Sequence, residues 1–176
     1  MTDSGLTSVE VPATGAYRID PERSTVHFEG RHWFGLAAVR ATFAVASGEI
    51  TVADPVEQSS VEVKVDSASF HSDQPRRDKH VASPALLDIA SNPDITFSSS
   101  AIRRAADGWV VEGSVTAHGG TVSTELTVDR ITPEDNGARV HARAEHLDRY
   151  AFGVTKVKGI AGRYFDLELD ALLVPA

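Results

Sequence analysis

Cysteine is missing from the 176 residues of this chain. Its absence excludes disulfide bonds, thiolate metal ligands and cysteine nucleophiles, and it fits a reducing compartment. Long apolar runs are missing as well, since none approaches the roughly 20 residues that a membrane-spanning helix needs. We therefore do not expect an integral membrane protein.

Positive charge is scarce. Against 25 aspartates and glutamates stand 17 lysines and arginines, which gives a formal net charge of -8. No cluster of basic residues interleaved with aromatics interrupts this excess. A phosphate backbone would be repelled overall, so we expect no nucleic-acid partner. The mixture of 41% hydrophobic and 24% charged residues is typical of a soluble globular protein.

The first residues lack the features of an export signal. Residues 1–15 contain neither a basic start nor an apolar core of about 7–15 residues. We predict that 1–15 form a poorly ordered lead and that 16–176 form one domain, because the chain is too short for two comfortable ones. We also predict that the protein is cytoplasmic.

Alternation of apolar and polar residues with a period of two dominates the rest of the chain. At 61–65 three valines alternate with two charged residues, and 165–173 repeats the pattern. Such alternation predicts strands with one face toward water. Turn residues at 47–49 and 134–137 separate successive runs, and short links favour antiparallel neighbours. Eight or nine such strands, closed so that no edge stays unpaired, predict an all-β, antiparallel, eight-stranded barrel; a two-sheet sandwich is the alternative.

Between residues 73 and 93 the alternation lapses. Ser83 and Pro84 fit the N-cap and the first position of a helix. The leucines of "PALLDIA", which begins at Pro84, fall on one side of such a helix. The sequence therefore predicts a short helical insertion around 76–91, with the helix itself starting at Ser83 and Pro84.

Catalytic motifs are missing. No G-x-S-x-G elbow, H-E-x-x-H pair, P-loop or G-x-G-x-x-G turn occurs. Seven histidines raise the alternative of a metal site built from different strands. However, His27 and His32 are five residues apart, as are His141 and His146, and an odd separation on a regular strand points side chains to opposite faces. We therefore predict no catalytic residues, no metal ligands and no cofactor.

Large and small residues share the inward faces of the predicted strands. Phe28, Phe43 and Phe165 are large, whereas Gly30 and Ala117 are small. One interpretation is that these side chains pack only on one another. The other is that the mixture leaves a tunnel through the barrel.

Four separated segments carry recognisable motifs: 17–35, 77–99, 113–121 and 147–153. The motif positions are Ser24, Val26, Phe28 and His32; Arg77, Asp78, His80, Pro93, Ile95 and Phe97; Gly113, Val115, Thr116, Gly119 and Thr121; and "LDRYAFG". In this order they resemble the YceI family of lipocalin-like, polyisoprenoid-binding proteins. The resemblance spans about residues 17–174.

The resemblance implies a lipocalin-like barrel that holds a polyisoprenoid, or the tail of an isoprenoid quinone, in its interior. The ligand is then expected to contact inward apolar residues and residues at the mouth: Val26, Phe28, His32, Phe34, Val39, Phe43, Phe70, Leu86, Leu87, Phe97, Arg149, Phe152, Phe165 and Leu167. We expect non-catalytic binding, storage or transport. Family members often pair, so a homodimer is a further expectation.

Two other functions stay open. An enzyme acting on a small apolar substrate would use His32, His80 or Arg149 at the mouth as acid, base or anion clamp. An interaction module would have a solid core, and cavity volume separates it from a carrier, because ligand sites measure about 300–1,000 Å³. The acidic composition favours a soluble shuttle over a membrane-docked one, since anionic lipids would repel it.

The charges of "HLDRYAFG" predict a contact with the helical insertion. Asp148 and Arg149 are complementary to residues 76–80, which carry both charge signs. We expect the two segments to pair and so to tie the mouth of the barrel to the helical insertion.

Overall fold

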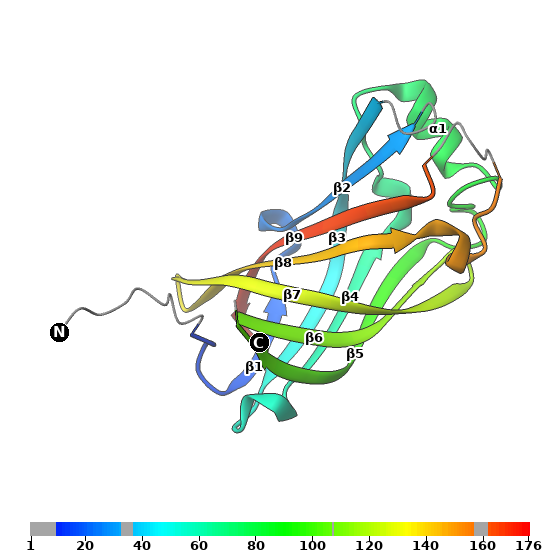
Figure 1. The fold of residues 1–176 in the computed structure, drawn as a ribbon. Helices are drawn as coiled ribbons and strands as arrows, with labels where there is room; N and C mark the ends of the chain where they lie inside the picture. The colour runs from blue at the N-terminus through cyan, green and yellow to red at the C-terminus, as the bar shows by residue number, and fades with distance from the viewer. Residues whose placement is uncertain (1–9, 33–36, 107, 157–161) are drawn as a thin grey trace.

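The computed structural model describes residues 10–32, 37–106, 108–156 and 162–176, which form a barrel (Figure 1). The strands are β1 (Gly15–Ile19), β2 (Thr25–His32), β3 (Ala37–Val52), β4 (Ser60–Asp66), β5 (Asp94–Ala105), β6 (Gly108–Ala117), β7 (Gly120–Glu134), β8 (Gly137–Asp148) and β9 (Tyr164–Pro175). The helical elements are α1 (Pro75–Ala82) and the 3-10 helices η1 (Pro21–Arg23), η2 (Val56–Gln58), η3 (Ser67–Ser69) and η4 (Arg149–Phe152).

The barrel closes because two short strands share one place in its wall. β1 and β2 both pair with β3 and with β9, one after the other along the barrel axis. Pairing of β3 with β4 completes the ring. All the ladders are antiparallel, so the predicted eight-stranded antiparallel barrel is confirmed, with nine strand segments in eight positions. Every strand in the described part of the chain has neighbours on both sides, which leaves no free edge to which a second copy could add.

The predicted alternation sets which side chains face inward. On β4, Val63 and Val65 are buried, whereas Glu62 and Lys64 are exposed. The successive side chains of a strand point to opposite faces, so this pattern places the valines in the barrel and the charges in water.

Buried apolar residues crowd the end of the barrel opposite α1. Tyr17 and Ile19 of β1, Ile50 of β3, Trp109 of β6 and Leu173 of β9 belong to this core. The start of the chain's first strand and the end of its last strand meet here (Figure 1). This end is therefore closed by the barrel's own side chains, and the partly buried aromatics lie toward the other end.

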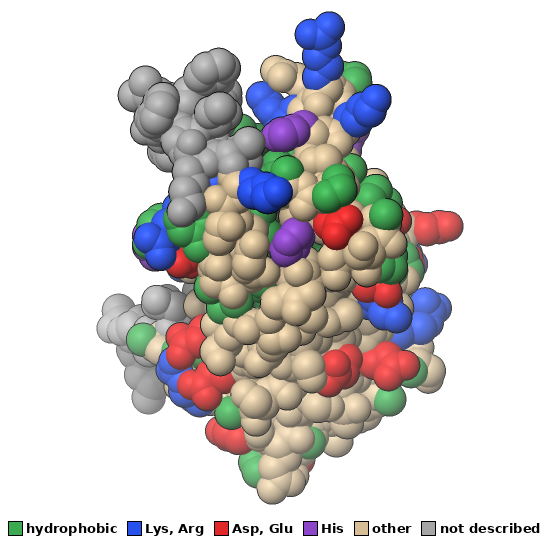
Figure 2. Space-filling model, turned by 90° about the vertical axis from the view of Figure 1, so that its right-hand side faces the viewer, with side chains coloured by type: hydrophobic (Ala, Val, Ile, Leu, Met, Phe, Trp, Pro, Cys, Tyr) green, Lys and Arg blue, Asp and Glu red, His purple; other side chains and the backbone are tan. Residues whose placement is uncertain are grey.

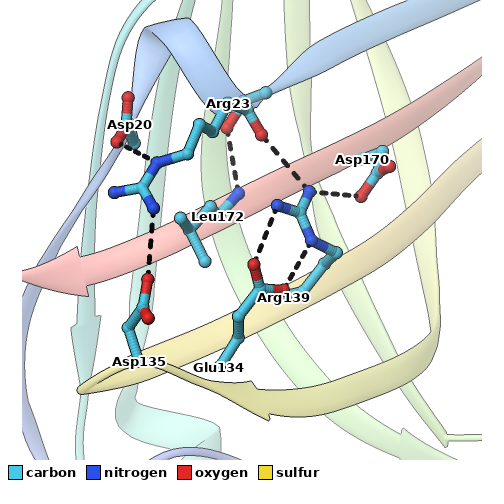
Figure 3. A network of polar contacts seen from close by, with 8 residues as sticks. Asp20, Arg23, Glu134, Asp135, Arg139, Asp170 and Leu172 are labelled. Atoms are coloured by element: carbon cyan, nitrogen blue, oxygen red, sulfur yellow. Dashed lines mark hydrogen bonds and ion pairs between the residues drawn. The ribbon is translucent and has the colours of Figure 1, made fainter.

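A network of charges ties the outside of the closed end (Figure 3). Arg139 of β8 donates from Nε and Nη2 to Glu134, at 2.7 and 3.3 Å, and from Nη1 to Asp170, at 3.1 Å. Its Nη1 also donates to the carbonyl oxygen of Arg23, at 3.2 Å, and Arg23 in turn pairs with Asp135 at 3.1 Å. The network therefore links the β7–β8 hairpin, β9 and η1.

The helix lies earlier than the sequence predicted. α1 begins at Pro75 and ends at Ala82, so a helix starting at Ser83 and Pro84 is wrong. The residue before a proline avoids the helical region, and Ser83 is extended, with φ -68° and ψ 163°. Ser83 therefore ends the helix, its hydroxyl donating to the carbonyl oxygen of His80. Pro75, not Pro84, takes the first helical position, and turns follow Ser83.

The predicted lead, residues 1–15, lies outside the described residues as far as position 9. Its last part is tied to the barrel, because the Tyr17 hydroxyl donates to the carbonyl oxygen of Ala13 at 2.6 Å. Among the helices of the described chain, none combines the length and apolarity needed to cross a membrane.

Candidate functional site

A cavity of about 730 Å³ occupies the barrel at the end that carries α1 and η4. Its wall is mostly apolar and is built by β2, β3, β5, β6, β8 and β9, with α1 and η4 at the rim. The volume falls within the roughly 300–1,000 Å³ of ordinary ligand sites. It contradicts the solid core that the interaction-module alternative requires.

Most of the residues predicted to contact a ligand come together in this cavity. Those that line it are Phe28, Val39, Phe43, Phe70, Leu86, Leu87, Arg149, Phe152, Phe165 and Leu167. They come from strands far apart in the sequence and from the turns after α1. Their role as ligand contacts stays a prediction, and the structure gives them one shared surface.

Two predicted contacts lie elsewhere. Val26 and Phe97 are buried in the core and do not line the cavity. Phe97 packs over Gly113, where an added Cβ would come within 2.7 Å of its ring. Phe34 and the side chain of His32 lie outside the described residues.

Aromatic rings form one wall of the cavity. The Phe28 ring of β2 lies 5.4 Å from that of Phe165, in a stacked arrangement. It also meets the rings of Phe70 and Phe43 edge-on, at 5.7 and 6.5 Å. Edge-on and offset contacts at these distances are favourable for aromatic pairs. The rings therefore support one another at the wall and leave the centre of this end open.

Further residues line the cavity that the sequence did not predict as ligand contacts. Ile95 and Val115 stand on alternating strands and were detectable by the same inward periodicity. Val81 was missed because the helix was placed too late in the chain. Val154 follows η4, and Tyr164 is the first residue of β9. No alternation of apolar and polar residues there indicates which side chain faces inward.

The segment "HLDRYAFG" forms the end of β8 and η4. The Asp148 side chain caps η4 by accepting from the Tyr150 N–H at 3.0 Å, and Gly153 ends it with φ +86°. Arg149 is only 7% exposed. Its Nε donates to the carbonyl oxygen of Gly162 at 2.8 Å, and its Nη1 to those of Val154 and Lys156 at 3.0 and 2.7 Å. Burial lowers the pKa of Arg149. The guanidinium thus ties η4 to the backbone of Val154, Lys156 and Gly162 at the rim of the cavity.

The partner of Asp148 differs from the prediction. Its carboxylate accepts two hydrogen bonds from Arg163, at 3.0 and 2.9 Å, and not from residues 76–80. These bonds lower the pKa of Asp148 and raise that of Arg163. On α1, Asp78 instead accepts from the N–H of Ser72 at 3.0 Å. Both acidic groups therefore stabilise their own loops.

Two histidines also line the cavity. His80 lies on α1, and His118 lies in the β6–β7 turn with φ +53°. The Nδ1 atom of His118 is buried and has no hydrogen-bond partner among the described residues. In that same part of the chain, no group of three or more histidine, aspartate or glutamate side chains is arranged to hold a metal ion.

Comparison with known sequences finds one family over most of the chain. A family model described as the YceI-like domain matches residues 17–172. A UPF0312 protein of Vibrio cholerae is 30% identical and covers 94% of this chain and 91% of its own length. A UPF0312 protein of Pseudomonas putida is 32% identical over 67% of this chain and 63% of its own length.

Solved structures share the fold. BcnA of Burkholderia cenocepacia is similar with a TM-score of 0.69 and 24% identity, over 89% of this chain and 99% of BcnA. A polyisoprenoid-binding domain from Saccharophagus degradans, implicated in plant cell wall breakdown, gives a TM-score of 0.65 at 12% identity, over 93% and 100% of the two chains. At these identities the similarity shows a common barrel.

Proposed function

Because the chain belongs to the YceI-like family, we propose that it binds a long isoprenoid lipid inside the barrel and stores or carries it without changing it chemically. The mostly apolar cavity of about 730 Å³ is the observation that carries this proposal. The description of the Saccharophagus degradans neighbour as a polyisoprenoid-binding domain supports the class of ligand.

The energetics favour a long chain over a short one. Each CH₂ group removed from water contributes about 0.8 kcal/mol, so one five-carbon isoprene unit contributes at most roughly 4 kcal/mol. Association itself costs an estimated 4–15 kcal/mol. One unit barely offsets that cost, whereas several units against Phe28, Phe165 and Leu167 bind without a charged contact.

Native mass spectrometry tests the proposal directly. Protein purified from its own host is expected to carry a lipid whose mass includes repeats of the isoprene unit. Stripped protein is expected to take up added octaprenol, and the octaprenol extracted after incubation is expected to be unchanged. Protein that is empty and also ignores octaprenol overturns the proposal, and a chemically altered lipid overturns its non-catalytic part.

A matched pair of variants locates the binding. Ala117 of β6 lines the cavity, so Ala117→Trp places an indole ring inside it and is expected to weaken octaprenol binding at least tenfold. Ala101 of β5 is exposed on the outside, so Ala101→Trp adds the same ring without touching the cavity. Equal binding by the two variants would place the lipid elsewhere.

A further inference from the structure

The charges of the chain are segregated along the barrel. The segments that border the cavity, residues 71–93, 148–156 and 162–165, are here called the mouth collar. The mouth collar contains six lysines and arginines and four aspartates, whereas the rest of the sequence contains 11 basic and 21 acidic residues. The excess of negative charge therefore lies outside the collar.

Several positive groups of the mouth collar are free to meet a partner. Arg76 and Lys79 of α1 and Lys156 after η4 are exposed, and none of them forms an ion pair with another described residue. In Figure 2, Lys, Arg and His side chains gather at the upper end of the molecule, and Asp and Glu side chains lie mainly on the barrel below. Asp73, Asp78 and Asp88 of the collar likewise have no lysine or arginine partner among the described residues, so this end carries an excess of two positive charges, the buried Arg149 included.

An exposed aromatic residue lies in the same collar. Tyr164, at the start of β9, is 41% exposed. Among the described residues, it is the one large hydrophobic side chain that is exposed. The guanidinium of Arg163 lies 5.2 Å from the centre of its ring. Tyrosine beside a cation suits the boundary between water and lipid, where the ring sits at the level of the head groups.

We propose that the mouth collar docks on an anionic lipid bilayer and so turns the cavity toward the membrane, where its ligand enters and leaves. This inference rests on the proposed function. The net charge of -8 alone predicts repulsion, but charges beyond the Debye length of about 8 Å are largely screened. β7 has 15 residues, about 50 Å of extended chain, so its far end lies well beyond that distance. When the collar touches the bilayer, the charges of the collar therefore contribute more to the electrostatic interaction than the distant negative charges do.

Vesicle flotation tests the docking. Wild-type protein is expected to float with vesicles that contain phosphatidylglycerol, to stay behind with vesicles of phosphatidylcholine alone, and to be released by high salt. Each basic residue near an anionic surface contributes about a fivefold change in binding. The double variant Arg76→Glu, Lys79→Glu is therefore expected to bind at least tenfold more weakly.

The control variant carries the same change in charge at the other end of the molecule. Arg18 of β1 and Arg130 of β7 are exposed, so Arg18→Glu, Arg130→Glu should leave flotation unchanged within twofold. Equal loss in both variants, or no flotation of the wild type, overturns the docking. Octaprenol uptake from nonionic detergent, measured in parallel, separates the two ideas: uptake without flotation overturns only the docking, and no uptake by any variant overturns the proposed function.

Discussion

Arg139 Nε lies 2.7 Å from Glu134 Oε2 at the closed end of the barrel. The hydrogen bond from Arg139 lowers the pKa of Glu134. A carboxyl group whose pKa is lower in the folded state stabilises the fold above its ordinary pKa, and this stabilisation is lost as the pH falls through the folded value.

An Arg139→Gln variant is therefore expected to be less stable than the wild type at neutral pH. The difference should shrink as the pH falls below about 4.3, the ordinary pKa of a glutamate. Urea unfolding at a series of pH values measures it. Arg130→Gln, an exposed change on neighbouring β7, serves as the control and should show little difference at any pH. A deficit for Arg139→Gln that is independent of pH contradicts the role of Glu134.

Arg149→Met is expected to destabilise the rim of the cavity. The variant leaves the carbonyl oxygens of Val154, Lys156 and Gly162 without their donor, and an unsatisfied buried group costs about 1–3 kcal/mol. Urea unfolding gives the loss in the free energy of unfolding. Arg163→Met removes an exposed pair and should cost no more than about 1 kcal/mol. A larger effect at 163 than at 149 would contradict the structural role of the buried guanidinium.

Gly120→Ala is expected to push η4 away from the β6–β7 turn. An added Cβ would lie 2.5 Å from the carbonyl oxygen of Phe152, which is backbone and cannot rotate away. Overpacking of this kind costs about 1–3 kcal/mol.

The neighbouring glycine provides the comparison for Gly120→Ala. At Gly119 an added Cβ meets nothing closer than 3.6 Å, but φ is +77°, so Gly119→Ala costs about 1–2 kcal/mol through the backbone alone. Thermal unfolding ranks the two variants, and octaprenol binding should suffer only in Gly120→Ala, because Phe152 lines the cavity. Unchanged binding in Gly120→Ala would count against the coupling of the turn to η4.

Phe28→Ala and Phe97→Ala distinguish the contribution of the cavity wall to ligand binding from the contribution of the core to stability. Phe97 is buried and does not line the cavity, so Phe97→Ala should cost about 3–5 kcal/mol of stability and leave octaprenol affinity unchanged. Phe28 borders the open space, so Phe28→Ala should cost less stability but weaken octaprenol about tenfold, or about 1.4 kcal/mol. Calorimetric titration and urea unfolding measure both quantities. Equal affinities in the two variants would remove Phe28 from the binding surface.

The barrel was predictable because its signal is local. Alternation at 61–65 and 165–173 depends only on neighbouring residues, and closure follows from the need to pair the outer strands. The mixture of Phe28 with Gly30 on one strand left open both a packed interior and a tunnel, and the cavity agrees with the second interpretation. Inward alternation and the resemblance to the YceI family together predicted ten of the residues that line the cavity.

The features that the sequence did not predict depend on a choice between two similar local signals or on contacts between residues far apart in the chain. Pro75 and Pro84 are equally good helix starts, and only the extended conformation of Ser83 decides between them. Asp148 meets Arg163 because β8 and β9 pair here, with Asp148 opposite Tyr164, and charge complementarity to residues 76–80 did not reveal this pairing. The cytoplasmic location, the absence of catalysis and the homodimer stay predictions.

The position of the chain's last residue has a practical consequence. Tyr17 stands opposite Pro175, and the N–H of Ala176 donates to the carbonyl oxygen of Ala16 at 3.0 Å, at the closed base of the barrel. A tether or fluorophore attached after Ala176 therefore points away from the entrance. The protein can be immobilised on a sensor chip by this terminus, with its opening facing the flowing sample, ready to report lipid capture.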